Sequence, residues 1–227
     1  FGRFFINPLL YVVILAAIFL GYRRVKMERK SFNIRILGGW SELKNLVVAG
    51  AMLSFMLSWF NLIVGLTVPV QFLLVVMVLS IIGLISYVYH FLSAGIIFSL
   101  SFIVLFILDW QNISFELFGY MFGDYPFDDG YSITVAIIIG LLLMAEGILI
   151  RRHGVRVASP RIEVTKRGLN AVAYFSKKIW VLPIIFVVPG DAIQAYYPLW
   201  PQFILGSQQF SIVLFPVVLG FQQIVRT

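Results

Sequence analysis

The sequence contains no cysteine and little charge. Without cysteine the chain has no disulfides, no thiolate catalysis and no thiolate metal site. Only 12% of the 227 residues are charged, whereas a soluble domain carries roughly 25%. The two histidines, His90 and His153, are not spaced as metal ligands, and neither a glycine-rich phosphate loop nor a Gly-x-Ser-x-Gly elbow is present. We therefore expect no metal, no cofactor and no catalytic site.

Most of the remaining residues are apolar, and 61% of the chain is hydrophobic. A crossing helix needs about 20 apolar residues, so the sequence predicts an all-α polytopic transmembrane bundle of about seven spans, forming one domain over residues 1–227. The predicted spans are 4–22, 46–66, 68–89, 91–110, 133–150, a kinked span from 179, and 203–225, with Pro69 at a helix start. The alternative is five spans followed by a re-entrant hairpin.

The charges that remain are strongly segregated along the chain. All Lys and Arg residues except Arg3 and Arg226 lie in segments 23–44 and 151–178, and the stretch 45–108 has no charged residue. The loop 110–132 is acidic and contains no Lys or Arg. By the positive-inside rule, the basic segments face the cytoplasm and the acidic loop lies outside. This predicts an odd number of crossings, an outer N-terminus and a cytoplasmic C-terminus.

Carboxylates inside an apolar span are costly, so Glu146 is a candidate functional residue. It could bind a proton or cation. We favour a structural role, in which Glu146 reaches the membrane interface or pairs with a basic side chain of a neighbouring helix. Asp191 and the acidic group of Asp124, Asp128 and Asp129 are more typical of turns.

The two basic segments are candidates for docking on lipid or on a protein. The net charge of +7 lies beside apolar spans, which favours anionic lipid over nucleic acid. Around Ile162 and Val164, basic and apolar residues interleave, as in a surface helix lying on an anionic leaflet. The same charge could only fix topology, or could dock a cytoplasmic protein. The candidates are Arg23, Arg24, Lys26, Arg151, Arg152, Arg161, Lys166 and Arg167.

Several short patterns resemble the MinJ-like proteins, a family of cell-division topology factors. They are FINPL at 5–9 and GYRRVKMERKSF at 21–32, then EG at 146–147, RRHG at 151–154 and SP at 159–160, and finally FP at 215–216 and GFQQ at 220–223. The resemblance implies a multi-span membrane region followed by a cytoplasmic PDZ domain, outside these 227 residues. It also implies DivIVA-like and MinD-like partners, and a bacterial cell membrane location enriched at septum and poles.

Three functions are compatible with these observations. The first is a non-enzymatic membrane scaffold of the division machinery that helps to place the septum. The second is a small-solute or lipid transporter that uses Glu146 and the Pro189-Gly190-Asp191 region. The third is an intramembrane enzyme, the weakest of the three because no nucleophile and base pair is visible.

Overall fold

A computed structural model describes residues 7–33, 40–86, 92–117, 120–122, 129–153, 159–164, 168, 170–189, 203–205 and 208–226. It contains both helices and strands. The helices are α1 (Pro8–Phe32), α2 (Trp40–Val64), α3 (Val70–Ile85), α4 (Ala94–Trp110) and α5 (Asp129–His153). The strands are β1 (Phe115–Leu117), β2 (Tyr120–Phe122), β3 (Ser159–Val164), β4 (Asn170–Pro189), β5 (Phe203–Leu205) and β6 (Gln208–Arg226).

A helix occupies each of the first five predicted spans, with shifted ends. Helix α1 begins at Pro8, where Asn7 caps the first turn by accepting a hydrogen bond from the Leu9 N–H at 3.0 Å. It continues through the first basic run to Phe32, beyond the predicted end. Pro69 is the N-cap of α3, so its predicted place at a helix start is confirmed.

The prediction of an all-α bundle of seven spans is wrong. The last two apolar runs form the long antiparallel strands β4 and β6, and the second basic segment contains β3 where a surface helix was considered. The resulting four-stranded sheet has the order β3-β4-β6-β5, and a separate two-stranded sheet pairs β1 with β2. The all-α alternative of five spans followed by a re-entrant hairpin is wrong for the same reason.

Two prolines explain why the last apolar runs are strands. Pro183 and Pro216 lie near the middle of β4 and β6 and are directly opposite each other in the register. Inside a helix each would cost about 3 kcal/mol, because proline lacks the N–H and clashes with the preceding turn. In β4 the Ile185 N–H points away from β6, towards α2. Because strand geometry repeats every two residues, the nitrogen of Pro183 also faces outward, where no ladder bond is lost.

Helix α2 covers the outer edge of β4 and hydrogen-bonds to it. The Ile185 N–H donates to Ser58 Oγ at 3.0 Å, and Asn61 Nδ2 donates to the Ile185 carbonyl oxygen at 3.2 Å. One turn beyond the helix, the Val68 N–H donates to the Val187 carbonyl oxygen at 2.8 Å. The side chains of α2 and the backbone beyond it thus satisfy N–H and carbonyl groups on the outer edge of β4, as a further strand would.

The outer edge of β6 pairs with β5 at Gln208–Phe210 and meets the segment that leads into α4 at Gly220. The Gly220 N–H donates to the Leu92 carbonyl oxygen at 2.9 Å. The approach is so close that a Cβ at Gly220 would overlap the Cβ of Leu92. Glycine is therefore required at position 220 for packing.

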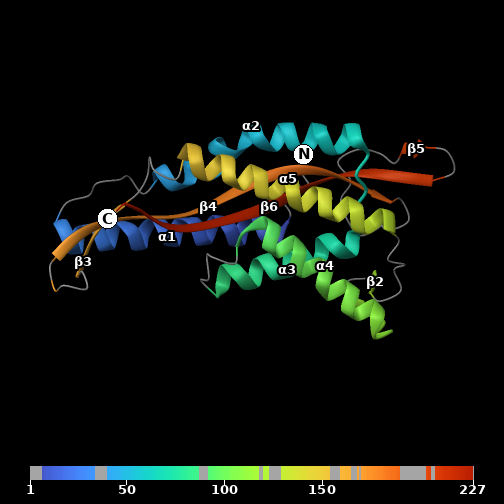
Figure 1. The fold of residues 1–227 in the computed structure, drawn as a ribbon, viewed down its shortest axis with the longest axis horizontal. Helices are drawn as coiled ribbons and strands as arrows, with labels where there is room; N and C mark the ends of the chain where they lie inside the picture. The colour runs from blue at the N-terminus through green and yellow to red at the C-terminus, as the bar shows by residue number, and fades with distance from the viewer. Residues whose placement is uncertain are drawn as a thin grey trace.

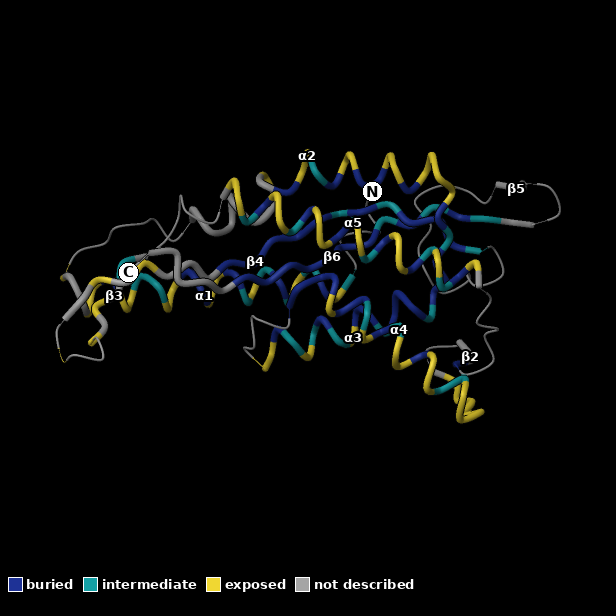
Figure 2. The backbone as a smooth tube through the Cα atoms, viewed as in Figure 1, coloured by how far each residue is buried: buried dark blue, intermediate teal, exposed yellow. Residues whose placement is uncertain are grey.

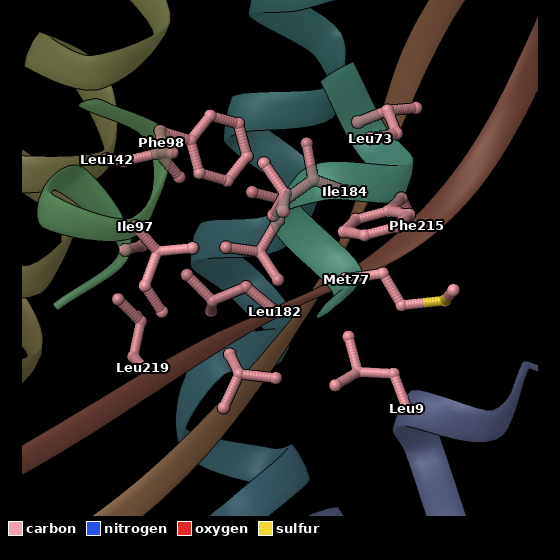
Figure 3. Packing of buried hydrophobic residues seen from close by; sticks show 14 of the residues in the cluster. Leu9, Leu73, Met77, Ile97, Phe98, Leu142, Leu182, Ile184, Phe215 and Leu219 are labelled. Carbon is pink, nitrogen blue, oxygen red and sulfur yellow. The ribbon is translucent and has the colours of Figure 1, made fainter. Parts of the chain in front are cut away.

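The hairpin of β4 and β6 lies in the middle of the molecule, among the helices (Figure 1). In the view of Figure 1, α2 runs above the hairpin, α5 crosses it obliquely, α1 runs along it, and α3 and α4 lie below it. Its central residues are buried on both faces, as continuous apolar strands usually are. Figure 3 shows Leu182, Ile184, Phe215 and Leu219 of the hairpin packed among side chains of the surrounding helices, including Leu9.

The helices carry many exposed residues (Figure 2), and a large share of these are apolar. On α2, Met52 is 73% exposed and Ile63 is 74% exposed, while the polar residues Ser54, Ser58 and Asn61 are buried against β4. A soluble helix has the opposite arrangement. Within the described residues two helices are long and apolar enough to cross a membrane, over Pro8–Lys30 and Gly130–Arg152. Large exposed apolar surfaces of this kind mark sites of interaction with a membrane or with another protein.

Substituting Gly220 with alanine should destabilise the fold. The added Cβ would force apart β6 and the backbone at Leu92, and overpacking of this kind costs about 1–3 kcal/mol. Thermal unfolding in detergent should show a lower midpoint for Gly220→Ala. The matched control is Gly147→Ala, because nothing lies within 4 Å of a Cβ at that position in α5. Equal midpoints for the two variants would contradict the close contact between β6 and Leu92.

Candidate functional site

Glu146 joins the start of α4 to the last third of α5. Ser93 Oγ donates a hydrogen bond to Glu146 Oε2 at 2.6 Å, and Ser93 is buried directly before the first residue of α4. The carboxylate is half-buried. The partner is a serine hydroxyl at the start of α4, whereas the structural role considered from the sequence was pairing with a basic side chain of a neighbouring helix. Among the described residues, no group of three or more His, Asp or Glu could hold a metal ion.

The predicted docking residues that the structure describes gather towards one end of the molecule. Arg23 and Lys26 are exposed near the end of α1, and Arg151 and Arg152 are exposed in the last turn of α5. Figure 1 shows the end of α1 beside β3 and the start of β4, with the last turn of α5 towards the same end. Segments that are far apart in the sequence thus place exposed cationic residues towards the same end of the molecule.

Arg24 differs from its neighbours because it turns inward. Its side chain is 11% exposed, and its Nε lies 3.7 Å from Oε1 of the buried Glu28. Arg161 is part of β3, opposite Ala173 of β4. Lys166 and Arg167 lie outside the described residues, as do His90, Asp124, Asp128 and Asp191. Asp129 is the first residue of α5.

Strands β3 and β4 carry an exposed apolar patch at the same end. Ile162 and Val172 are cross-strand partners, and Val164 and Tyr174 are each two residues further along their strands. All four therefore lie on one face, and all four are exposed. We call these four residues the β3–β4 patch. An apolar face flanked by exposed cations suits the boundary between headgroups and acyl chains of an anionic membrane.

Lys178 is a feature of this end that the sequence did not single out. Counted among the basic residues of the second segment, it is only 1% exposed, and its Nζ has no hydrogen-bond partner among the described residues. Burial, and to a lesser degree the positive charge of Arg24, lower the pKa of Lys178 to about 8. Its place at the start of the apolar run 179–188 was a weak signal of burial. No sequence pattern linked it to Arg24 and Glu28.

One curated protein is similar to this chain over 228 residues, with 29% identity. It is Cell division topological determinant MinJ of Bacillus subtilis (strain 168). The chain is similar to MinJ along nearly its whole length. The match covers 99% of this chain and 56% of MinJ, so the chain spans little more than half of that protein. The MinJ-like resemblance predicted from short patterns is confirmed. No protein-family model and no solved structure matches the chain.

The similarity to MinJ extends across the hairpin as well as the helices, because it covers almost every residue. The basic end, the β3–β4 patch and the cluster around Lys178 all lie within the matched length. The name of MinJ describes a positional role in division and no chemical reaction.

The buried Lys178 should make stability depend on pH. Its pKa is about 8 in the folded chain and 10.5 in the unfolded chain. Below about pH 8 Lys178 is protonated in both the folded and the unfolded chain. Between about pH 8 and pH 10.5 it is protonated mainly in the unfolded chain, so raising the pH through this range favours folding. We expect the thermal midpoint in uncharged detergent to rise by roughly 5 °C between pH 7.5 and 10.

The variant Lys178→Met should lose this rise and should be more stable than the wild type at pH 7.5, because it removes an unpaired buried charge. The matched control is Lys26→Met, which removes an exposed charge from α1 and should retain the rise. The buried position of the ammonium would be contradicted if Lys178→Met and Lys26→Met had the same pH profile.

Proposed function

We propose that this chain is the membrane region of a non-enzymatic cell-division topology factor, a scaffold that helps to place the division septum. The observation that carries the proposal is the similarity to MinJ over 99% of the chain. Since the chain spans 56% of MinJ, the proposal assigns to it the membrane-bound part of such a factor. The remaining part would carry a cytoplasmic PDZ domain, as the family resemblance implies.

The outward apolar faces support membrane embedding. Helices α1 and α5 have the length and composition to cross a bilayer, and α2 exposes Met52, Phe55, Trp59 and Ile63 on the side away from the hairpin. A polar inner face that binds β4 and an apolar outer face suit a lipid environment. The proposed location is the bacterial cell membrane, with enrichment at the septum and poles.

The basic end supports a cytoplasmic orientation for that part of the molecule. Both α1 and α5 end in exposed cations, namely Arg23, Lys26, Arg29, Lys30, Arg151 and Arg152. Positively charged flanks of this kind remain in the cytoplasm. The β3–β4 patch and these cations would rest on the anionic inner leaflet, each cation contributing about 1 kcal/mol. The same end would then face DivIVA-like and MinD-like partners, and the C-terminus would be cytoplasmic.

A transporter that uses an intramembrane carboxylate is the alternative, and Glu146 would be its proton or cation site. The hydrogen bond from Ser93 favours the scaffold, because it gives Glu146 a structural role in joining α4 to α5. Glutamine can still accept that hydrogen bond through Oε1, but it cannot titrate. The two functions therefore differ in what they require at position 146.

The variant Glu146→Gln should leave the scaffold function intact. We expect the full-length protein carrying Glu146→Gln and a fluorescent tag to localise at septa as the wild type does, with unchanged septum spacing. A deletion strain should place septa wrongly, and the variant should restore placement to within about 20% of the wild type. Ser93→Ala is the matched control, because it removes the hydrogen bond and leaves the carboxylate.

Two outcomes would count against the proposal. A uniform membrane distribution of the wild-type protein, with normal septum placement in the deletion strain, would exclude a topology factor. Loss of function in Glu146→Gln with full function in Ser93→Ala would favour the transporter, because only the titratable group would then matter.

A further inference from the structure

Strand β3 is an edge strand at the basic end of the molecule. The order β3-β4-β6-β5 places it at one side of the sheet, and it pairs with β4 along its whole length. Across the residues that the structure describes, no backbone hydrogen bond reaches its other side. An edge strand presents a row of N–H and carbonyl groups to which another strand can add. The outer edge of β3 is therefore a candidate surface for strand addition.

The pairing of β3 with β4 determines which backbone groups face outward. In β4 the odd-numbered residues direct their N–H and carbonyl groups away from β6, as the hydrogen bonds of Ile185 to α2 show. Because β3 lies along that edge of β4, its odd-numbered residues bond to β4, and Pro160, Ile162 and Val164 face outward. Proline has no N–H, so an outward position for Pro160 loses no ladder bond.

Two of the outward residues also carry exposed apolar side chains. Ile162 is 46% exposed and Val164 is 69% exposed, and both belong to the β3–β4 patch. Residues directly opposite each other in an antiparallel pair have their side chains on the same face, where they contact each other. A strand added to β3 would therefore gain backbone hydrogen bonds and apolar contacts from the same two residues.

The charge at this end indicates which kind of strand fits. Segments 23–44 and 151–178 contain fifteen Lys and Arg residues and three Glu residues, so no arrangement of ion pairs within these segments can neutralise them. Lys26, Arg29 and Lys30 are exposed near the end of α1, and α1 contacts β3. Complementary charge at an interface favours a partner of opposite sign and suppresses partners of like sign. The basic end therefore favours an acidic segment.

From these observations we propose that the outer edge of β3 binds an extended segment of a soluble protein partner by strand addition. Apolar residues of that segment alternate with Asp or Glu. The apolar side chains pack beside Ile162 and Val164, and the acidic side chains lie among the cations of the basic end. The added strand continues the β3–β4 patch, so it is compatible with contact between the patch and the inner leaflet. The binding mode rests on the cytoplasmic orientation in the proposed function and specifies the chemistry of the partner.

A designed peptide tests the edge, with the whole chain held in nanodiscs of phosphatidylcholine. The peptide has about nine residues, an ordinary strand length, and alternates valine with glutamate. Its basic counterpart has lysine in place of each glutamate. Fluorescence anisotropy should show that the chain binds the acidic peptide about tenfold more tightly than the basic one, because the charge of the basic end favours only the first.

Methylation of the peptide backbone separates strand addition from simple attraction between charges. In the added strand, the valines direct their N–H groups towards Ile162 and Val164, and the glutamates direct theirs away. Methylating the valine nitrogens should weaken binding by about tenfold or more, because it removes the donors. Methylating the glutamate nitrogens is the matched control and should leave the affinity within about twofold.

The variant Ile162→Pro tests the same contact from the side of the chain. It removes the outward N–H at position 162 and no hydrogen bond to β4. We expect it to bind the acidic peptide about tenfold more weakly, whereas Ile162→Val, which keeps the N–H, should bind as the wild type does. Thermal midpoints of both variants are measured in parallel. If Ile162→Pro does not fold, the methylated peptides still test the proposal on the unchanged chain.

Four results would overturn the proposal. Two are equal affinity for the acidic and basic peptides, and equal loss of affinity when the valines or the glutamates are methylated. If nanodiscs that contain phosphatidylglycerol abolish binding, the leaflet occupies the edge. If the free chain is a dimer that the peptide dissociates, a second copy occupies it. None of these measurements depends on septum placement, so failure of the proposed function would be seen separately.

Discussion

Backbone hydrogen bonding along the outer edges of the β4–β6 hairpin constrains the positions of the helices. In an apolar environment an unpaired N–H or carbonyl costs several kcal/mol, so a two-stranded hairpin needs partners on both sides. On β4 the partners are Ser58 and Asn61 of α2 and the backbone at Val68. On β6 the backbone at Leu92 is a partner. The polar face of α2 and the glycine at position 220 follow from this requirement.

The helices up to residue 153 could be predicted because composition decides them. Long apolar runs bounded by charge specify helices, and α5 ends among the arginines where the pattern changes. The last two runs are equally apolar, so composition alone could not separate strand from helix. The discriminating signals were Pro183 and Pro216 near the centres of the runs, together with many β-branched residues. Pro183 pairs with Pro216, more than 30 residues further along the chain, and no local sequence pattern indicates this register.

The candidate site could be predicted in part. Clustered cations at the ends of α1 and α5 are visible in the sequence, and the structure brings them towards the end that carries β3. Glu146 was recognisable as an unusual carboxylate, but its partner Ser93 lies 53 residues away. The cluster of Arg24, Glu28 and Lys178 depends on α1 packing beside β4, a tertiary contact. Individual lysines in a basic run look alike until packing buries one of them.

Cysteine cross-linking across the hairpin tests this account most directly, because the chain has no native cysteine. Val181 and Val218 are opposite each other with backbone groups facing outward, a pairing with Cα atoms about 4.5 Å apart that suits a disulfide. We expect rapid cross-linking of Val181→Cys with Val218→Cys in membranes. Val181→Cys with Leu214→Cys, four residues out of register, should not cross-link. Equal cross-linking of both pairs, or of neither, would contradict the hairpin.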